Sequence, residues 1–137
     1  MILGIGIDIV QIARFEREGL KPAFFYRLFT PDERAYCLSQ ARSAQHFAGR
    51  FAAKEAAVKA LCWLPARPRI TQVEVTREPD TGAPAISLIA DRSGLAPALP
   101  GGVRLYVSLS HSRTQAIAVV IAETEALNGL PGTNGAS

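Results

Sequence analysis

The sequence has few of the features that mark secreted or membrane-spanning proteins. Its 137 residues include only two cysteines, Cys37 and Cys62, and we expect both to be reduced thiols in a cytoplasmic protein. No apolar run approaches the roughly 20 residues that a transmembrane helix needs. The first ten residues contain no basic leader and run directly into Asp8, which argues against a signal peptide.

Several common functional motifs are missing as well. A dinucleotide-binding fingerprint starting at Gly4 and Gly6 would need a third glycine at the position of Ile9. No Cys/His spacing suggests zinc, and no Gly-x-Ser-x-Gly segment suggests a hydrolase. The net charge of +3 lies entirely within residues 1–60 and includes no block of Lys/Arg, so it indicates a phosphate ligand or an acidic partner better than nucleic acid.

The pattern of residues predicts a single α+β domain over residues 1–125, followed by a disordered tail over 126–137. Thr30, Pro31 and Glu33 form a strong helix start with a capping box. We expect a mostly antiparallel sheet packed on one long helix. The expected strands cover 2–10, 70–76, 84–90, 103–109 and 115–122, and the expected helices cover 11–19, a segment from 31, 44–62 and 91–97.

The first candidate for chemistry is Asp8. Alternation along residues 2–10 places it on one strand face with Gly4 and Gly6, opposite an apolar face. We interpret the two glycines as leaving that face open, so that a large ligand or a metal can approach the backbone. A solvent-facing Asp at a strand end is the alternative.

The second candidate is the pair Glu55 and Lys59, which lie one turn apart on one helix face. An exposed helix ion pair is the simplest interpretation. However, Glu55 borders the apolar stripe that includes Phe51 and Val58, and a metal with a bound phosphate would explain charges at that position. A third segment, Ser108 to Ser112 with His111, is uninformative by itself, because serine is common in turns.

Read in order, three motifs resemble the holo-[acyl-carrier-protein] synthases, the small type of 4′-phosphopantetheinyl transferase. These are Gly-Ile-Gly-Ile-Asp8, Arg50-Phe-Ala-Ala-Lys-Glu55-Ala-x-x-Lys59 and Ser-Leu-Ser110-His111-Ser. The resemblance covers residues 1–123, and the middle motif is very specific.

The resemblance implies transfer of 4′-phosphopantetheine from coenzyme A to a serine of apo-acyl carrier protein, with release of adenosine 3′,5′-bisphosphate. It implies that Asp8 and Glu55 bind Mg²⁺ and that Lys59 offsets negative charge on the phosphates. Arg50, Lys59, Ser110 and His111 would contact coenzyme A. The serine proton would go to Glu55 or to a metal-bound water.

The resemblance also implies a homotrimer with active sites between subunits, working in fatty acid biosynthesis or, if its carrier protein is of the polyketide type, in polyketide synthesis. Arg14 matches a basic position that docks the acidic carrier protein, and Arg17, Lys21 and Arg27 are expected to join it.

One segment departs from the family pattern. Residues 61–68 replace a glycine-rich phosphate loop with a sequence that contains Pro65 and Pro68, so a backbone phosphate cradle is not expected there. Arg67 or Arg69 could supply a side chain instead. A non-catalytic module that binds coenzyme A or the carrier protein is therefore the alternative function.

Overall fold

The computed structural model describes residues 1–16 and 22–125 and confirms the α+β class. Its main sheet has the strand order β1-β5-β4, with β1 (Ile2–Gln11) at one edge, β4 (Val103–His111) at the other and β5 (Gln115–Thr124) between them. All the pairings are antiparallel, and β4 with β5 forms the expected hairpin. The strand β4 continues through His111, so the loop at the hairpin tip is shorter than the sequence suggested.

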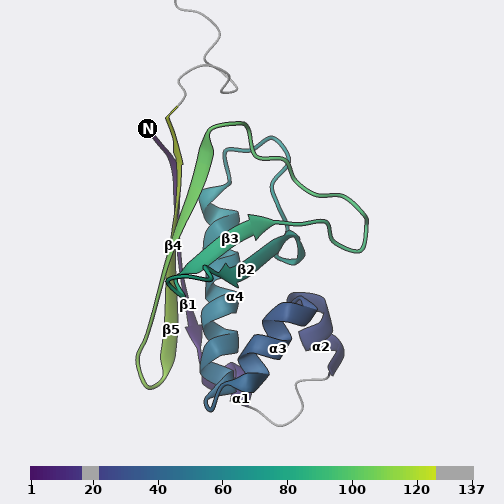
Figure 1. Cartoon of the computed structure of the whole chain (residues 1–137), viewed down its shortest axis with the longest axis vertical. Coiled ribbons are helices and arrows are strands. Elements are labelled where there is room, and N and C mark those ends of the chain that lie inside the picture. Colours follow the sequence, from purple (N-terminus) through teal and green to yellow (C-terminus); the bar gives the residue numbers. More distant parts are fainter. Residues whose placement is uncertain (17–21, 126–137) are drawn as a thin grey trace, which may run out of the picture.

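Helix α4 (Ser43–Ala60) packs along one face of this sheet (Figure 1). Gly4 and Gly6 make that packing possible, because a Cβ atom would lie 2.0 Å from the Ala60 carbonyl oxygen at position 4 and 1.8 Å from the Ala56 carbonyl oxygen at position 6. The interpretation of an open strand face was therefore wrong. The backbone that approaches these glycines belongs to a helix of the same chain.

A second, two-stranded sheet packs against α4 and lies next to β4. Its strands β2 (Val73–Arg77) and β3 (Pro84–Leu88) pair antiparallel, and a short 3₁₀ helix, η1 (Ile70–Gln72), occupies the start of the expected strand 70–76. The predicted helix at 91–97 is wrong: Asp91 instead accepts hydrogen bonds from the backbone N–H and hydroxyl of Ser93 and holds a turn. Such local side-chain bonds compete with helix formation.

Three short helices precede α4: α1 (Ala13–Glu16), α2 (Pro22–Leu28) and α3 (Pro31–Ser39). The capping box is confirmed, because Thr30 Oγ1 accepts from the Glu33 N–H at 3.2 Å and Glu33 Oε1 accepts from the Thr30 N–H at 2.8 Å. The expected helix 11–19 is borne out for 13–16, and its last residues lie outside the described ranges, as does the predicted tail.

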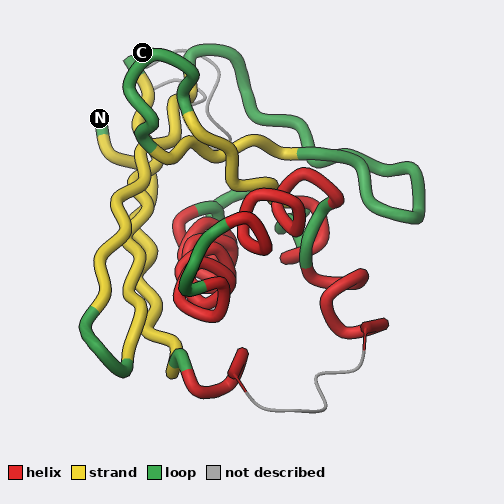
Figure 2. The backbone as a smooth tube through the Cα atoms, turned by 60° about the horizontal axis from the view of Figure 1, so that its bottom comes forward, coloured by secondary structure: helices red, strands yellow, loops and turns green. Residues whose placement is uncertain are grey.

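The described helices all lie on one side of the main sheet, and no element of residues 1–16 or 22–125 covers its other, largely apolar face (Figure 2). Ile5, Ile7 and Ile9 on β1 are 55–60% exposed there, and Tyr106 on β4 is 48% exposed. The register places them beside Ile117, Val119 and Ile121 of β5. Buried alanines and Val120 of β5 line the opposite face, against α4.

Both cysteines are free thiols. Cys37 is buried, and burial raises its pKa to about 11. Within residues 1–16 and 22–125, none of the helices has the length and apolar character of a membrane span.

Candidate active site

The structure brings Asp8, Glu55 and Lys59 together between the edge strand β1 and helix α4. Lys59 Nζ lies 3.1 Å from Asp8 Oδ1 and donates a hydrogen bond of 2.9 Å to the Ile7 carbonyl. The simple helix ion pair between Lys59 and Glu55 is not formed, since the partner of Lys59 is Asp8. The Lys59 side chain remains 54% exposed, so its ammonium group is accessible to a ligand.

Glu55 is half-buried beside this pair. Burial raises the pKa of its carboxyl group, and the nearby charge of Asp8 raises it further, while Lys59 and Arg14 oppose the rise. Two carboxylates close enough to repel each other are a suitable site for a cation.

The oxygen-only donor set of Asp8 and Glu55 fits Mg²⁺, which binds one or two carboxylates and completes its shell with water and phosphate oxygens. It does not fit a cation that needs a full protein cage. In the described part of the chain, no cluster of three or more His, Cys, Asp or Glu could hold a metal ion.

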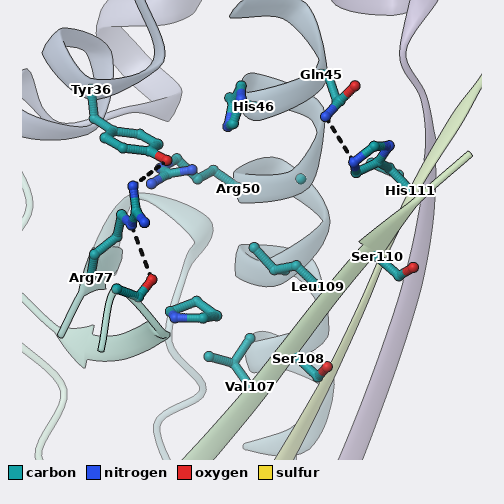
Figure 3. A pocket seen from close by; sticks show the side chains of 14 residues that line it. Tyr36, Gln45, His46, Arg50, Arg77, Val107, Ser108, Leu109, Ser110 and His111 are labelled. Atoms are coloured by element: carbon teal, nitrogen blue, oxygen red, sulfur yellow. Dashed lines mark hydrogen bonds between the residues drawn. The ribbon is translucent and has the colours of Figure 1, made fainter. Parts of the chain in front are cut away.

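A separate cavity of about 320 Å³ contains the other expected ligand contacts (Figure 3). Arg50 from α4 and His111 from the end of β4 line it, and His111 Nε2 lies 2.9 Å from Gln45 Nε2. Ser110 also lines the cavity, but its hydroxyl points away from Arg50, because Leu109 and His111 are the residues of β4 that alternate toward α4.

Tyr36, His46 and Arg77 are among the cavity residues that sequence reasoning missed. Tyr36 comes from α3, His46 from α4 and Arg77 from the end of β2. They are far apart in the sequence, and no short motif joins them. Only the packing of α3 and the β2–β3 hairpin against α4 brings them together.

The two groups of residues lie on different flanks of α4. Arg50 and Glu55 are five positions apart, which separates their directions by about 140° around the helix axis. Arg50 therefore faces the β2–β3 hairpin and β4, whereas Glu55 faces β1 and Asp8. A single chain does not combine the two groups into one site.

The basic residues expected to dock a carrier protein are partly described. Arg14 and Arg27 are exposed, on α1 and α2, and the Arg14 guanidinium lies 4.9 Å from the centroid of the Phe51 ring. Arg17 and Lys21 lie outside the described residues.

The altered segment 61–69 provides little for a phosphate. The Arg69 guanidinium is engaged with Asp91 at 2.7 Å and with the Ser93 hydroxyl at 3.2 Å. Arg67 is exposed, and Trp63 packs near Gly4. Arg69 therefore stabilises the turn at 91–94, and Arg67 is the more accessible of the two side chains for a phosphate.

Comparison with known proteins identifies the family. A model of the 4′-phosphopantetheinyl transferase superfamily matches residues 4–118. A holo-[acyl-carrier-protein] synthase of Geobacter sulfurreducens is 48% identical over 126 residues, which cover 90% of this chain and 98% of the relative.

Solved structures agree with this result. A holo-(acyl-carrier-protein) synthase from Bacillus anthracis, in complex with CoA (3′,5′-ADP), matches with a TM-score of 0.69 and 31% identity, over 90% of this chain and 98% of that one. A holo-[acyl-carrier-protein] synthase from Helicobacter pylori, in complex with coenzyme A, matches with a TM-score of 0.63 and 29% identity, over 87% of this chain and 99% of that one. The chain therefore belongs to the holo-[acyl-carrier-protein] synthase family of 4′-phosphopantetheinyl transferases.

Proposed function

We propose that this protein transfers the 4′-phosphopantetheine group of coenzyme A to a serine of apo-acyl carrier protein in a Mg²⁺-dependent reaction. The observation that carries the proposal is the position of Lys59, whose exposed ammonium lies against Asp8 beside a Glu55 carboxyl of raised pKa. Membership of the family supplies the reaction class.

The reaction exchanges one P–O bond for another. The serine oxygen forms a bond to the phosphorus that carries the pantetheine arm, the bond from that phosphorus to the bridging oxygen of the pyrophosphate breaks, and adenosine 3′,5′-bisphosphate leaves. Glu55 or water takes the serine proton.

Each residue of the site has a separate task. Asp8 and Glu55 would hold Mg²⁺, which when bound stabilises negative charge on the pyrophosphate oxygens. Lys59 exchanges its contact with Asp8 for a contact with a phosphate oxygen, which its exposure allows. Arg50 and His111 bind the nucleotide end of coenzyme A in the 320 Å³ cavity.

We further propose that the protein is a cytoplasmic homotrimer whose active sites lie between subunits. Two observations support the shared site. The cavity residues around Arg50 and the pair Asp8 and Glu55 lie on different flanks of α4. Three isoleucines on the outer face of the main sheet are more than half exposed. An apolar face of this kind favours burial against further copies of the chain. Arg14 and Arg27 would bind the acidic carrier protein, whose role in fatty acid biosynthesis would place this enzyme in lipid metabolism.

The test is incubation with coenzyme A, Mg²⁺ and an apo-acyl carrier protein, followed by mass spectrometry of the carrier protein. We expect a mass gain of about 340 Da, the size of the phosphopantetheine group, and its loss with EDTA. Asp8→Ala and Glu55→Ala should abolish the gain, whereas Glu125→Gln, at a carboxylate that is 73% exposed, should retain it.

Two outcomes would contradict the proposal. A mass gain of the carrier protein that persists with EDTA and in both Asp8→Ala and Glu55→Ala would contradict the proposed metal site. Coenzyme A binding without any gain, over several carrier proteins, would leave a binding module and point to residues 61–69.

A further inference from the structure

The 320 Å³ cavity concentrates positive charge without a carboxylate to balance it. The guanidinium groups of Arg50 and Arg77 line it together with the imidazole rings of His46 and His111, and no Asp or Glu does. Arg50 is only 5% exposed, and its Nε atom has no hydrogen-bond partner among the described residues. A buried guanidinium N–H without an acceptor is costly, so the cavity is built for an anion that supplies one.

Tyr36 is the residue that holds these cations in place. The Arg50 guanidinium carbon lies 4.0 Å from the centroid of the Tyr36 ring, and that of Arg77 lies 4.9 Å from it. Arg77 Nη1 also donates a hydrogen bond of 2.7 Å to the Tyr36 hydroxyl (Figure 3). Attraction between a cation and an aromatic face offsets part of the repulsion between the two guanidinium groups.

Two further contacts fix the geometry of the cluster. The His46 ring meets Tyr36 edge to face, with centroids 5.6 Å apart. Arg77 Nε donates a hydrogen bond of 3.0 Å to the Gly82 carbonyl in the β2–β3 turn. The guanidinium of Arg77 is thereby held between the Tyr36 ring and the turn, although Arg77 itself is an exposed residue.

We propose that Tyr36 is a positioning residue that aligns Arg50 and Arg77 to bind a terminal phosphate monoester and so makes the enzyme select coenzyme A over its form without the 3′-phosphate. A phosphate monoester is nearly dianionic at neutral pH and offers three acceptor oxygens, which suits two guanidinium groups. In coenzyme A the 3′-phosphate is the only group of this class. The inference rests on the proposed function, and it adds the residues that determine selectivity.

The test compares coenzyme A with dephospho-coenzyme A as substrates for the wild type, Tyr36→Leu, Tyr36→Phe and Arg77→Gln. We expect Tyr36→Leu to lower the preference in kcat/KM for coenzyme A roughly tenfold, through KM, with kcat changed by less than about twofold. Arg77→Gln should behave similarly. Tyr36→Phe keeps the ring and should lower the preference in kcat/KM for coenzyme A only about threefold.

A matched control and a binding measurement separate this inference from a general effect on the fold. Tyr26→Leu removes a similar ring, 4.0 Å from the Arg34 guanidinium and outside the cavity, and should leave the preference unchanged. Calorimetry with adenosine 3′,5′-bisphosphate and adenosine 5′-monophosphate should show a wild-type preference for the bisphosphate that Tyr36→Leu and Arg77→Gln both reduce.

The possible results distinguish the two proposals. If Tyr36→Leu and Arg77→Gln lower kcat/KM for both substrates equally, or leave the preference for coenzyme A unchanged, the proposed role of Tyr36 is wrong. The proposed transfer reaction is unaffected by that result. If Tyr36→Leu does not fold, Arg77→Gln and Tyr36→Phe decide the question alone. If the bisphosphate preference depends on Tyr36 but no carrier protein is modified, the cavity is confirmed and the transfer reaction is wrong.

Discussion

Lys54 Nζ lies 2.6 Å from Glu33 Oε1, and both side chains are only 1% exposed. Glu33 Oε2 also accepts a hydrogen bond of 2.9 Å from the Val75 N–H, and Lys54 donates one of 2.6 Å to the Val73 carbonyl. The pair therefore connects α3, α4 and β2, the three elements that provide Tyr36, Arg50 and Arg77. Burial lowers the pKa of Lys54, and the charge of Glu33 opposes that change.

Lys54→Met should lower the free energy of unfolding by about 3–5 kcal/mol at pH 7, because it leaves the Glu33 carboxylate buried without its partner. Lys59→Met is the matched control on the same helix, and loss of its half-exposed pair with Asp8 should cost less than about 1 kcal/mol. Urea unfolding measures both. Equal losses in the two variants would contradict this account.

Gly6→Ala should destabilise the protein by about 3 kcal/mol or more, because its Cβ atom would lie 1.8 Å from the Ala56 carbonyl oxygen and force α4 away from β1. Transfer activity should fall as well, since α4 carries Glu55. Gly101→Ala is the control: its Cβ atom would meet nothing within 4 Å, and stability should not decrease. Thermal unfolding compares the two, and an unchanged melting temperature in Gly6→Ala would refute the close contact.

Glu55→Gln should raise the melting temperature at pH 7 while it abolishes transfer. Because the pKa of Glu55 is raised on folding, the folded state binds more protons between the unfolded and folded pKa values, and stability falls as pH rises through that window. The neutral amide of Glu55→Gln avoids this loss of stability and the repulsion from Asp8. Melting curves from pH 4 to 8 should therefore show a higher melting temperature for the variant only at pH values above the folded pKa of Glu55. Mg²⁺ should stabilise the wild type and not the variant, and a destabilised Glu55→Gln would contradict the argument.

Glu55→Gln and Arg50→Gln subunits should complement each other if the active site is shared between subunits. Each variant alone should be nearly inactive at low coenzyme A concentration. When they are co-expressed in equal amounts and assemble at random, about a quarter of the sites combine an intact Glu55 with an intact Arg50. Specific activity should therefore reach about a quarter of the wild type. Mixed assemblies with no recovered activity would place the whole site within one subunit.

Local features of the sequence predicted much of the fold. Thr30, Pro31 and Glu33 are neighbours along the chain, so their helix cap needs no tertiary partner, and the structure has it. The final hairpin followed from two β-rich segments around a short polar loop. Alternation in residues 2–10 correctly separated two strand faces, but it did not show which of them the helix covers.

The sequence by itself predicted the family, which the comparisons confirm, and the proposed metal ligands Asp8 and Glu55, because Asp8, Glu55 and Lys59 stand in short motifs of characteristic spacing. Because Arg50 and Glu55 are five residues apart, the periodicity of a helix also implies that they lie on different flanks of α4. Only the tertiary structure decided that Gly4 and Gly6 admit a helix, that no described element covers the isoleucine face, and that Tyr36, His46 and Arg77 meet around Arg50. Those outcomes depend on which surfaces pack together, and packing joins residues that no local pattern relates.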